Sequence, residues 1–448
     1  METEVNGNDE YLVGGGGPAG VGNTALETIT QCPVTQGLAP NYAYHDAVEI
    51  EGGEISNFVD RVIPLNGLSS DPYEFIFDTM ADFFVDLSSI IMYVRMALVK
   101  EDDGSTPGAK DNDLTLCDNL INALWRGVDT KLNDVVIHPE SATLQGYRAQ
   151  IEYLLSVEKG ITHSFTAGGF GQTEANRKAH FGKVQLKEFD ICGPIALDIL
   201  RSGNHLAPGH KLSLTFHRAD HQFVLINSKT ETPTKYRLVI KDIYMEANRI
   251  RLLPEVASTL LSGPQNYQLT HTELKDYPLP TGQKSWNIKV YAGGVLPHQV
   301  VLGFVSTAAF TGGYKENPFK FDNFGLNHAC LRVNGVRVPQ DPLKPEFDKN
   351  LFARELLHVY QNTGKFRNNT GNYIDAGSFK SGACLIPFDL TPDQCNNAHK
   401  HASMQGSLDV ELGWAESLSE NVTIIVLSVF NQVIQFAEPG APPLVTIY

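Results

Sequence analysis

The chain is poor in three features: long hydrophobic runs, closely spaced cysteines and charged residues. No run approaches the roughly 18 consecutive apolar residues of a transmembrane helix, so we expect no membrane span. The six cysteines lie far apart and none forms a Cys-x-x-Cys pair, which argues against a zinc site of the usual paired spacing. We interpret them as reduced core thiols of a protein made in a reducing compartment. They are Cys32, Cys117, Cys192, Cys330, Cys384 and Cys395.

The charge balance argues against another class of function. Charged residues make up 19% of the 448 residues, and the net charge is −16. Binding to nucleic-acid phosphates needs clustered lysine and arginine, so we expect no strong nucleic-acid binding by the chain as a whole. A low charge fraction is typical of a protein that buries much surface against partners, and also of a large β-protein with many Ser, Thr, Asn and Gly loops.

Two histidine pairs suggest metal sites, but each motif is incomplete. In His217-Arg218-Ala219-Asp220-His221, arginine follows the first histidine, where helical zinc proteases need glutamate. His399-Lys400-His401 is the His-x-His of cupins, but Gln405 stands where a glutamate is wanted and Glu411 is too far along the chain. We interpret both pairs as surface or loop histidines.

Glycine-rich and acidic segments also lack complete ligand sites. Gly14–Gly20 and Gly168-Gly169-Phe170-Gly171 have no Lys-Ser/Thr after the last glycine, so neither is a phosphate-binding loop. The carboxylates of segment 101–113 lie in a polar loop that lacks the twelve-residue calcium pattern. We therefore nominate no catalytic, cofactor-binding or metal-binding residue, and we expect a protein that is not an enzyme.

Alternating apolar runs separated by Gly, Pro and Asn turns predict many short strands and few helices. The helical patterns lie at residues 113–124, 142–158, 254–262 and 348–362. Such a pattern is typical of β-sandwiches or barrels. A chain of 448 residues is also too long for one ordinary core, which predicts two domains of about 200 residues.

The order of the predicted elements repeats, with several strands, a helix and several more strands in each half. We divide the chain into a flexible Gly-rich arm at 1–44, a first sandwich at 45–254, a linker with a short helix at 255–265 and a second sandwich at 266–448. The arm cannot bury enough apolar area to offset its ordering entropy, so we expect it to be flexible unless a neighbouring subunit tethers it.

The clearest local signal is a β-hairpin at residues 331–339. Asn334-Gly335 joins two alternating apolar runs and supplies the two positive φ angles of a tight two-residue turn. The loop before it carries Phe319, Phe321 and Phe324, which we expect to pack under the sheet that follows. This segment specifies shape and contains no nucleophile or general base in an evident setting.

Residues 316–339 also carry a family resemblance. Their Asn-Pro-Phe-x-Phe, x-Leu-Asn and Val-Asn-Gly-x-x-Val-Pro motifs resemble the major capsid protein of Polinton/Maverick elements and adintoviruses. Further pieces follow in the family's order over roughly residues 45–436. These are Val62-Ile63-Pro64-Leu65, Pro72 to Phe75, Val128 to Asn133, the helix with Tyr147, Ile151 and Glu152, Val301 to Val305, Thr363 to Lys365, Phe388 to Asp393, Gly406 to Glu416 and Asn421 to Gln435.

The resemblance implies an all-β double jelly roll: two eight-stranded sandwiches with short helices in the inter-strand loops. It further implies a homotrimer that forms a near-hexagonal capsomer of an icosahedral shell around double-stranded DNA. Such a subunit contacts neighbouring capsomers and minor capsid or penton proteins, is made in the host cytoplasm, is assembled in the nucleus or cytoplasm, and resides in the virion. The family has no catalytic residues and no cofactor. The inserts at 101–112, 160–182 and 366–375 are then expected at roll ends, at the outer surface or in subunit contacts.

Two other functions stay open on the sequence. A carbohydrate- or receptor-binding β-sandwich, such as a spike or lectin-like module, could use Tyr314, Phe319 and Tyr373 to stack on sugars. A cupin-like enzyme could use the histidines of segment 399–401. Sugar binding would favour the first alternative, and a stoichiometric metal would favour the second.

Overall fold

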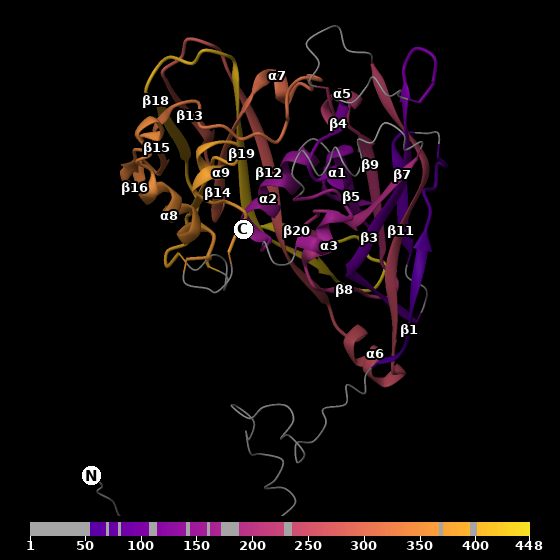
Figure 1. Ribbon diagram of the computed structural model, residues 1–448. Helices are drawn as coiled ribbons and strands as arrows, with labels where there is room; N and C mark the ends of the chain where they lie inside the picture. Colours follow the sequence, from indigo (N-terminus) through magenta and orange to yellow (C-terminus); the bar gives the residue numbers. More distant parts are fainter. Residues whose placement is uncertain are drawn as a thin grey trace, which may run out of the picture. The chain divides into compact units, whose positions relative to one another are not determined.

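Both halves of the chain contain two antiparallel sheets, each with four main strands, and the order of these main strands is the same in the two halves. Figure 1 shows the two halves. The computed structural model describes residues 54–68, 71–78, 82–106, 114–139, 144–158, 162–171, 188–227, 235–366, 371–394 and 401–448. The arm expected at residues 1–44 lies outside the described residues. Residues 53–448 form one compact unit, and all of the following concerns that unit.

The first sandwich, here called roll 1, is built from eight main strands between residues 54 and 252. One sheet has the order β1-β11-β3-β7 and the other the order β2-β9-β5-β6. The strands are β1 (Glu54–Val62), β2 (Tyr73–Asp78), β3 (Phe83–Lys100), β5 (Trp125–Leu132), β6 (Val135–His138), β7 (Phe189–Pro194), β9 (Lys211–Arg218) and β11 (Tyr236–Leu252).

The second sandwich, roll 2, is built from eight main strands between residues 265 and 436. Its sheets have the orders β12-β19-β14-β17 and β13-β18-β15-β16. The strands are β12 (Gln265–Leu279), β13 (Ser285–Tyr291), β14 (Gln299–Ser306), β15 (Leu326–Val333), β16 (Val336–Leu343), β17 (Leu385–Asp389), β18 (Leu408–Trp414) and β19 (Val422–Phe436).

The two rolls share one topology. When the main strands are counted along the chain, each roll has one sheet in the order 1-8-3-6 and one in the order 2-7-4-5. Two four-stranded sheets that the chain visits alternately in this way form a jelly roll. The predicted all-β double jelly roll is therefore confirmed.

The inserts also fall at equivalent places in the two rolls. Between the third and fourth main strands lie α1 (Leu120–Ala123) in roll 1 and α7 (Thr307–Phe310) in roll 2. Between the fifth and sixth lie α2 (Gln145–Ser156) and α3 (Thr162–Thr166) in roll 1. In roll 2 the same position holds η5 (Phe347–Lys349), α8 (Ala353–Asn362) and α9 (Ala376–Lys380).

A few short elements complete the fold. Strands β4 (Leu114–Leu116) and β10 (Leu225–Asn227) pair with each other, β8 (His205–Leu206) adds to β3, and β20 (Leu444–Ile447) adds to β19. The short helices η4 (Ile199–Arg201) and α5 (His221–Val224) lie in roll 1, and α6 (Pro254–Leu261) connects β11 to β12. Among the described helices, none is long and apolar enough to cross a membrane.

Most predicted elements are present, and the main error lies at residues 113–124. A helix was expected there, but Leu114–Leu116 is a strand that pairs with Leu225–Asn227, and only Leu120–Ala123 is helical. The leucine spacing of four reflects burial from several sides, since all four leucines of this segment are buried. Pairing with a strand more than 100 residues away leaves no local signal.

Two further segments differ in detail from the prediction. Residues 125–138 have a strand-like sequence throughout, but they form the hairpin β5–β6, whose turn residues Asn133 and Asp134 both have positive φ. The helix expected at 348–362 is divided into η5 and α8. The predicted helices at 142–158 and 254–262 are confirmed as α2 and α6, and the 331–339 hairpin is confirmed with φ of 50° at Asn334 and 84° at Gly335.

A continuous hydrophobic core runs through both rolls. Trp125 in roll 1 and Trp414 in roll 2 are its largest fully buried side chains. Cys117, Cys330 and Cys384 are free and buried, as expected for core thiols, and Cys192 is free and partly buried. The remaining cysteines, at positions 32 and 395, lie outside the described residues.

Candidate functional site: the junction between the two rolls

An aromatic cluster forms one part of the contact between the rolls. Tyr147 of α2 stacks on Phe310 of α7 at 5.4 Å between ring centroids, and the rings of Phe319 and Phe321 meet it edge-on at 5.6 and 6.3 Å. Phe319 and Phe321 are buried, as the sequence predicted. Their partner, however, comes from the other roll, so these side chains also fasten roll 2 to roll 1.

A buried arginine is the centre of the polar part of the junction. The side chain of Arg148, on α2, is fully buried and forms ion pairs with Glu152 at 3.0 Å and with Asp198 at 2.6 Å. Glu152 also binds Arg201 at 2.5 Å. A buried guanidinium is tolerated only with such partners, because removing the charge from water is costly.

Asp198 and His138 then bind the edge of roll 2. Asp198 accepts the backbone N–H of Thr272 at 3.0 Å and the hydroxyls of Thr270 and Thr272 at 2.9 and 3.0 Å. His138 Nε2 donates to the carbonyl oxygen of Thr272 at 2.7 Å. Thr272 lies on β12, an edge strand of its sheet, so its outward-pointing N–H and C=O groups face no neighbouring strand. Side chains of roll 1 supply these hydrogen bonds instead.

The charges of this cluster are set by burial and by the arginine. Burial alone would raise the pKa of Asp198, but Arg148, His138 and the Thr272 N–H together lower it. Burial and then Arg148 lower the pKa of His138 to about 4. At neutral pH the junction therefore holds an ionised aspartate, a guanidinium and a neutral imidazole. His271, whose ring centroid is 4.9 Å from that of His138, adds a second imidazole from roll 2.

Smaller contacts extend the junction along the same edge. Tyr267 Oη accepts the N–H of Ala207 at 3.1 Å, and His210 Nε2 lies 2.8 Å from Gln265 Oε1. At the other end, the N–H of Tyr373 donates to the carbonyl oxygen of Leu154 at 3.0 Å. Roll 1 thus uses β6, α2 and the segment between β7 and β9, whereas roll 2 presents β12 and the loops that carry Phe310, Phe319 and Tyr373.

Sequence reasoning did not find this cluster. His138, Arg148, Asp198 and Thr272 come from four separated segments, and none belongs to a motif. The one available signal was an arginine inside the apolar stripe of the helix at 142–158, since arginine is almost never fully buried without a partner.

The first histidine pair named by the sequence is divided between the end of β9 and the start of α5. His217 lies near the end of β9, and its Nε2 is 3.1 Å from Asp129 Oδ2 on the neighbouring strand β5. His221 begins α5 and accepts the N–H of Leu238 at 3.4 Å through Nδ1. The two rings therefore have separate partners.

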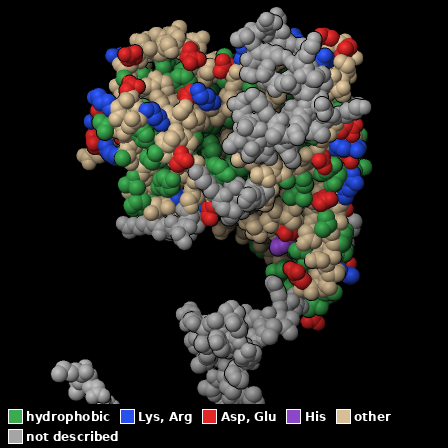
Figure 2. Space-filling view, in the orientation of Figure 1, with side chains coloured by type: hydrophobic (Ala, Val, Ile, Leu, Met, Phe, Trp, Pro, Cys, Tyr) green, Lys and Arg blue, Asp and Glu red, His purple; other side chains and the backbone are tan. Residues whose placement is uncertain are grey.

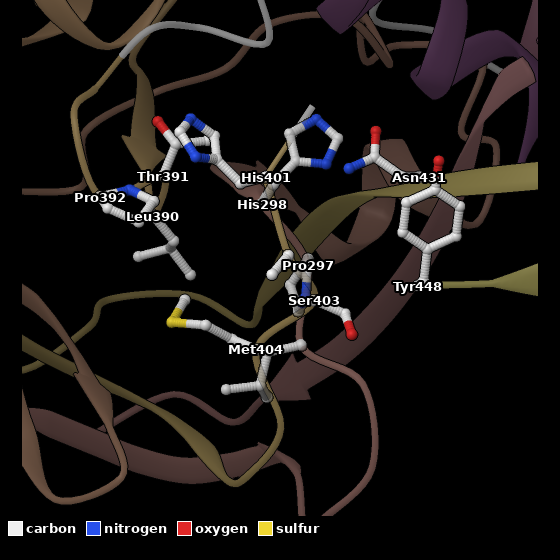
Figure 3. A pocket seen from close by; sticks show the side chains of 12 residues that line it. Pro297, His298, Leu390, Thr391, Pro392, His401, Ser403, Met404, Asn431 and Tyr448 are labelled. Carbon is white, nitrogen blue, oxygen red and sulfur yellow. The ribbon is translucent and has the colours of Figure 1, made fainter. Parts of the chain in front are cut away.

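The second histidine pair borders a small pocket in roll 2 (Figure 3). Of residues 399–401 only His401 is described, and its Nε2 lies 2.9 Å from a carboxylate oxygen of Asp393. His298, Asn431 and Tyr448 line the same pocket, which Figure 3 shows with the two imidazoles at one edge. Its volume is about 20 Å³, which is room for one water molecule. The pocket does not have the size of a cupin substrate site.

Among the described residues, one group has donor atoms close enough for a metal: His328, Cys330 and Glu411. Cys330 of β15 is paired with Glu411 of β18, and His328 lies two residues before Cys330 on β15. Glu411 also binds the guanidinium groups of Arg332 and Arg337. Burial and the Glu411 carboxylate raise the pKa of Cys330 to about 12, so the thiol stays protonated and donates to Glu411 at 3.3 Å. Within the described residues, the thiol proton and the two guanidinium groups engage the Glu411 carboxylate, so the group is an ion-pair cluster.

The aromatic residues considered for sugar stacking are packing residues. Tyr314 is buried and its hydroxyl donates to the carbonyl oxygen of Tyr236, and Phe319 is buried at the junction. Tyr373 packs edge-on against Phe170. An apolar cleft of about 210 Å³ lies nearby, lined by Leu144, Phe223 and Phe310 among others. Three polar side chains, those of Arg126, Asp220 and Thr311, also line this cleft.

Comparisons with known proteins agree with the topology. No family model matches the chain. A chain of the Sputnik virophage superimposes with a TM-score of 0.58 at 10% identity, covering 90% of each chain. The Faustovirus major capsid protein gives 0.55 at 8% identity, covering 87% of this chain and 92% of that one. The mavirus major capsid protein gives 0.50 at 10% identity, covering 92% and 95%.

One curated protein is related in sequence. It is the uncharacterized protein F54H12.2 of Caenorhabditis elegans, 20% identical over 380 residues, which are 81% of this chain and 90% of that protein. The likeness to the solved structures shows the fold of viral double jelly-roll capsid proteins, and it extends over both rolls.

Proposed function

We propose that this protein is the major capsid protein of an icosahedral double-stranded DNA virus or virus-like transposon. The observation that carries the proposal is the repetition of one jelly-roll topology in two rolls that a built junction holds side by side. A chain of this kind fills two equivalent positions of a ring. Solved capsid proteins of Faustovirus and mavirus with the same fold support this role.

Three chains would then form a capsomer with six rolls and near-hexagonal outline. Head-to-tail contacts close into a ring when the rotation per subunit allows it, and three is the number that turns paired rolls into a hexagon. Such permanent interfaces typically bury about 2,000 Å² or more. In this role the strands are the scaffold, and no residue acts as a catalyst.

We infer that the source is a Polinton/Maverick element or an adintovirus. The ordered motifs of residues 45–436 support this assignment, and so does a relative in a nematode, since such elements would leave copies in animal genomes. The protein would be made in the host cytoplasm and reside in the virion. Its partners would be its own copies and the minor capsid or penton proteins.

Light scattering and negative-stain microscopy of the purified full chain test this proposal. We expect a trimer of three times 49.3 kDa and, at high concentration, hexagonal tiles or spherical shells. A monodisperse monomer at micromolar concentration would overturn it. Deletion of residues 1–40 should leave the trimer intact and impair shell assembly, and loss of the trimer would refute that role for the arm.

A further inference from the structure

The large apolar side chains exposed on the described surface are concentrated at two places. Six of sixteen lie on β1 and the segment after it, and four lie on β16 and the insert that follows. We call the first set the β1 surface and the second the α8 surface. The β1 surface comprises Ile55, Phe58, Val59, Ile63, Leu65 and Leu68, and the α8 surface comprises Val336, Leu351, Leu357 and Phe366.

These places are the topological equivalents of the two sides of the existing junction. Inside the chain, roll 1 presents its fifth main strand β6, the helix α2 and Asp198, and roll 2 presents its first main strand β12 and the aromatic residues of α7 and the loop after it. The equivalents that remain are β16 with α8 in roll 2 and β1 in roll 1.

The two equivalent helices, α2 and α8, differ in how much of their surface is buried. In α2, which roll 2 covers, ten of twelve residues are buried. In α8, only Glu355, Val359 and Asn362 of ten residues are buried, although its apolar residues also gather on one side. Within the part of the chain that the structure describes, the helix in roll 2 thus has the position of a covered helix without a comparable cover.

The two equivalent edge strands differ in the same way. The residues of β12 that meet roll 1, such as Tyr267, Leu269 and His271, are buried. Strand β1 is also the first strand of its sheet, yet Val59 is 65% exposed and Ile63, just beyond it, is 66% exposed. An edge strand with a long exposed apolar face is normally covered in the functional assembly.

We propose that the β1 surface of one copy packs against the α8 surface of the next, in the manner in which roll 2 packs against β6 and α2 within the chain. This inference rests on the proposed function and names the surfaces that would form its ring. The two surfaces lie on opposite sides of the described unit in Figure 1, as a head-to-tail contact requires. Hydrophobic side chains also reach the surface on both of these sides in Figure 2.

Charged substitutions on each surface test the pairing. One full-length variant carries Val59→Glu and Ile63→Glu, and a second carries Leu351→Glu and Leu357→Glu. We expect each variant to keep the circular dichroism and cooperative unfolding of the wild type and to run as a monomer in light scattering. A control with Leu444→Glu and Leu260→Glu changes residues of similar exposure, 62% and 56%, outside both surfaces and should remain a trimer.

Mixing the two monomeric variants tests the head-to-tail arrangement. Each variant keeps one intact surface, so an equimolar mixture should form a dimer of one copy of each, which cannot close into a ring. If β1 surfaces instead paired with each other, the second variant alone would dimerise and mixing would add nothing. A wild-type trimer whose surface variants stay trimeric would overturn this inference and leave the proposed function standing, whereas a monomeric wild type would overturn the proposed function.

Discussion

Asn334 and Gly406 fit against each other where the 331–339 hairpin meets the start of β18. Asn334 Oδ1 accepts the N–H of Ser407 at 2.9 Å, and its Nδ2 donates to the carbonyl oxygen of Gln405 at 3.2 Å. Between these two residues, Gly406 has a φ of +145°, and a Cβ there would lie 1.8 Å from Asn334 Oδ1. The asparagine therefore forms the hairpin turn and also fixes the entry to the seventh main strand of roll 2.

Replacing Gly406 with alanine should lower the free energy of unfolding by about 2–4 kcal/mol. The methyl group would force the Asn334 amide away from both hydrogen-bond partners. The alanine would also have to adopt a backbone conformation that L-residues rarely adopt. Urea unfolding followed by circular dichroism measures the change. Gly335→Ala is the matched control, because its φ is also positive but nothing lies within 4 Å of the added Cβ. The control should cost about 1 kcal/mol, and equal losses in the two variants would contradict the role of the Asn334 contacts.

Arg148→Met should destabilise the protein by about 3–5 kcal/mol, because it leaves Asp198 and Glu152 without their buried cation. Adding Asp198→Asn to that variant should recover part of the loss, since the remaining buried charge is then removed. A double-mutant cycle from urea unfolding gives the coupling between the two residues. Additive effects would show that the ion pair contributes little to the junction.

His138 should make stability depend on pH in a defined window. Its pKa is about 4 in the folded protein and 6.5 when unperturbed, so the unfolded chain binds the proton more readily. The stabilisation that follows from keeping His138 neutral is complete above pH 6.5. It falls as the pH drops towards 4, and the free energy of unfolding does not change further through this residue below pH 4. The difference corresponds to about 3 kcal/mol.

His138→Gln keeps a donor for the Thr272 carbonyl and removes the titration. The variant should therefore lose about 3 kcal/mol less than the wild type between pH 7 and pH 4, measured by urea unfolding at each pH. His205→Gln changes an exposed histidine and should behave like the wild type. Parallel pH curves for the wild type and His138→Gln would refute the assignment.

The His328–Cys330–Glu411 group should not respond to zinc. Equimolar Zn²⁺ should change the melting temperature by less than about 1 °C, because the thiol carries its proton and two guanidinium groups bind the Glu411 carboxylate. Glu411→Gln should cost about 1–2 kcal/mol, discounted for the partial exposure of both arginines. A zinc-induced rise of several degrees that Cys330→Ser abolishes would show a metal site instead.

The division of the chain at residues 255–265 remains a proposal, and limited proteolysis tests it. Helix α6 has no buried residue, so brief digestion with chymotrypsin should cut beside Leu260 or Leu261. The two fragments should elute together on gel filtration, because the junction joins the rolls through ion pairs and aromatic contacts. Cleavage elsewhere first, as mapped by mass spectrometry, would argue against this linker.

The order of strands in the fold could be predicted only through the resemblance, although many single elements followed from local pattern. The apolar runs at Gln299–Ser306 and Val422–Phe436 and the Asn334-Gly335 turn can be recognised locally, because a short apolar run and a turn with positive φ are local properties. The β4–β10 pair did not, since its three-residue strands are defined by a partner far along the chain. Leu114 and Leu116 therefore read as a helix.

The junction was beyond sequence reasoning for a different reason. Arg148, Asp198 and Thr272 have ordinary neighbours in the sequence, and their roles arise only when α2 lies against the edge of β12. The aromatic loop was recognised as packing material, but the same pattern gives no sign that Tyr147 of the other roll completes it. The periodicity of apolar residues predicts that a side chain is buried, but it does not predict which residues will cover that side chain.

The repeated strand order has a consequence for how the protein can vary. In the ring we propose, the six corners alternate between two different sequences, so any substitution is copied at every second corner and never at all six. A loop in roll 2 can then lengthen or change its charge while the corners made by roll 1 keep their contacts unaltered. With two rolls of different sequence in one chain, one roll can keep the contacts that close the shell while the loops of the other roll change at its outer surface.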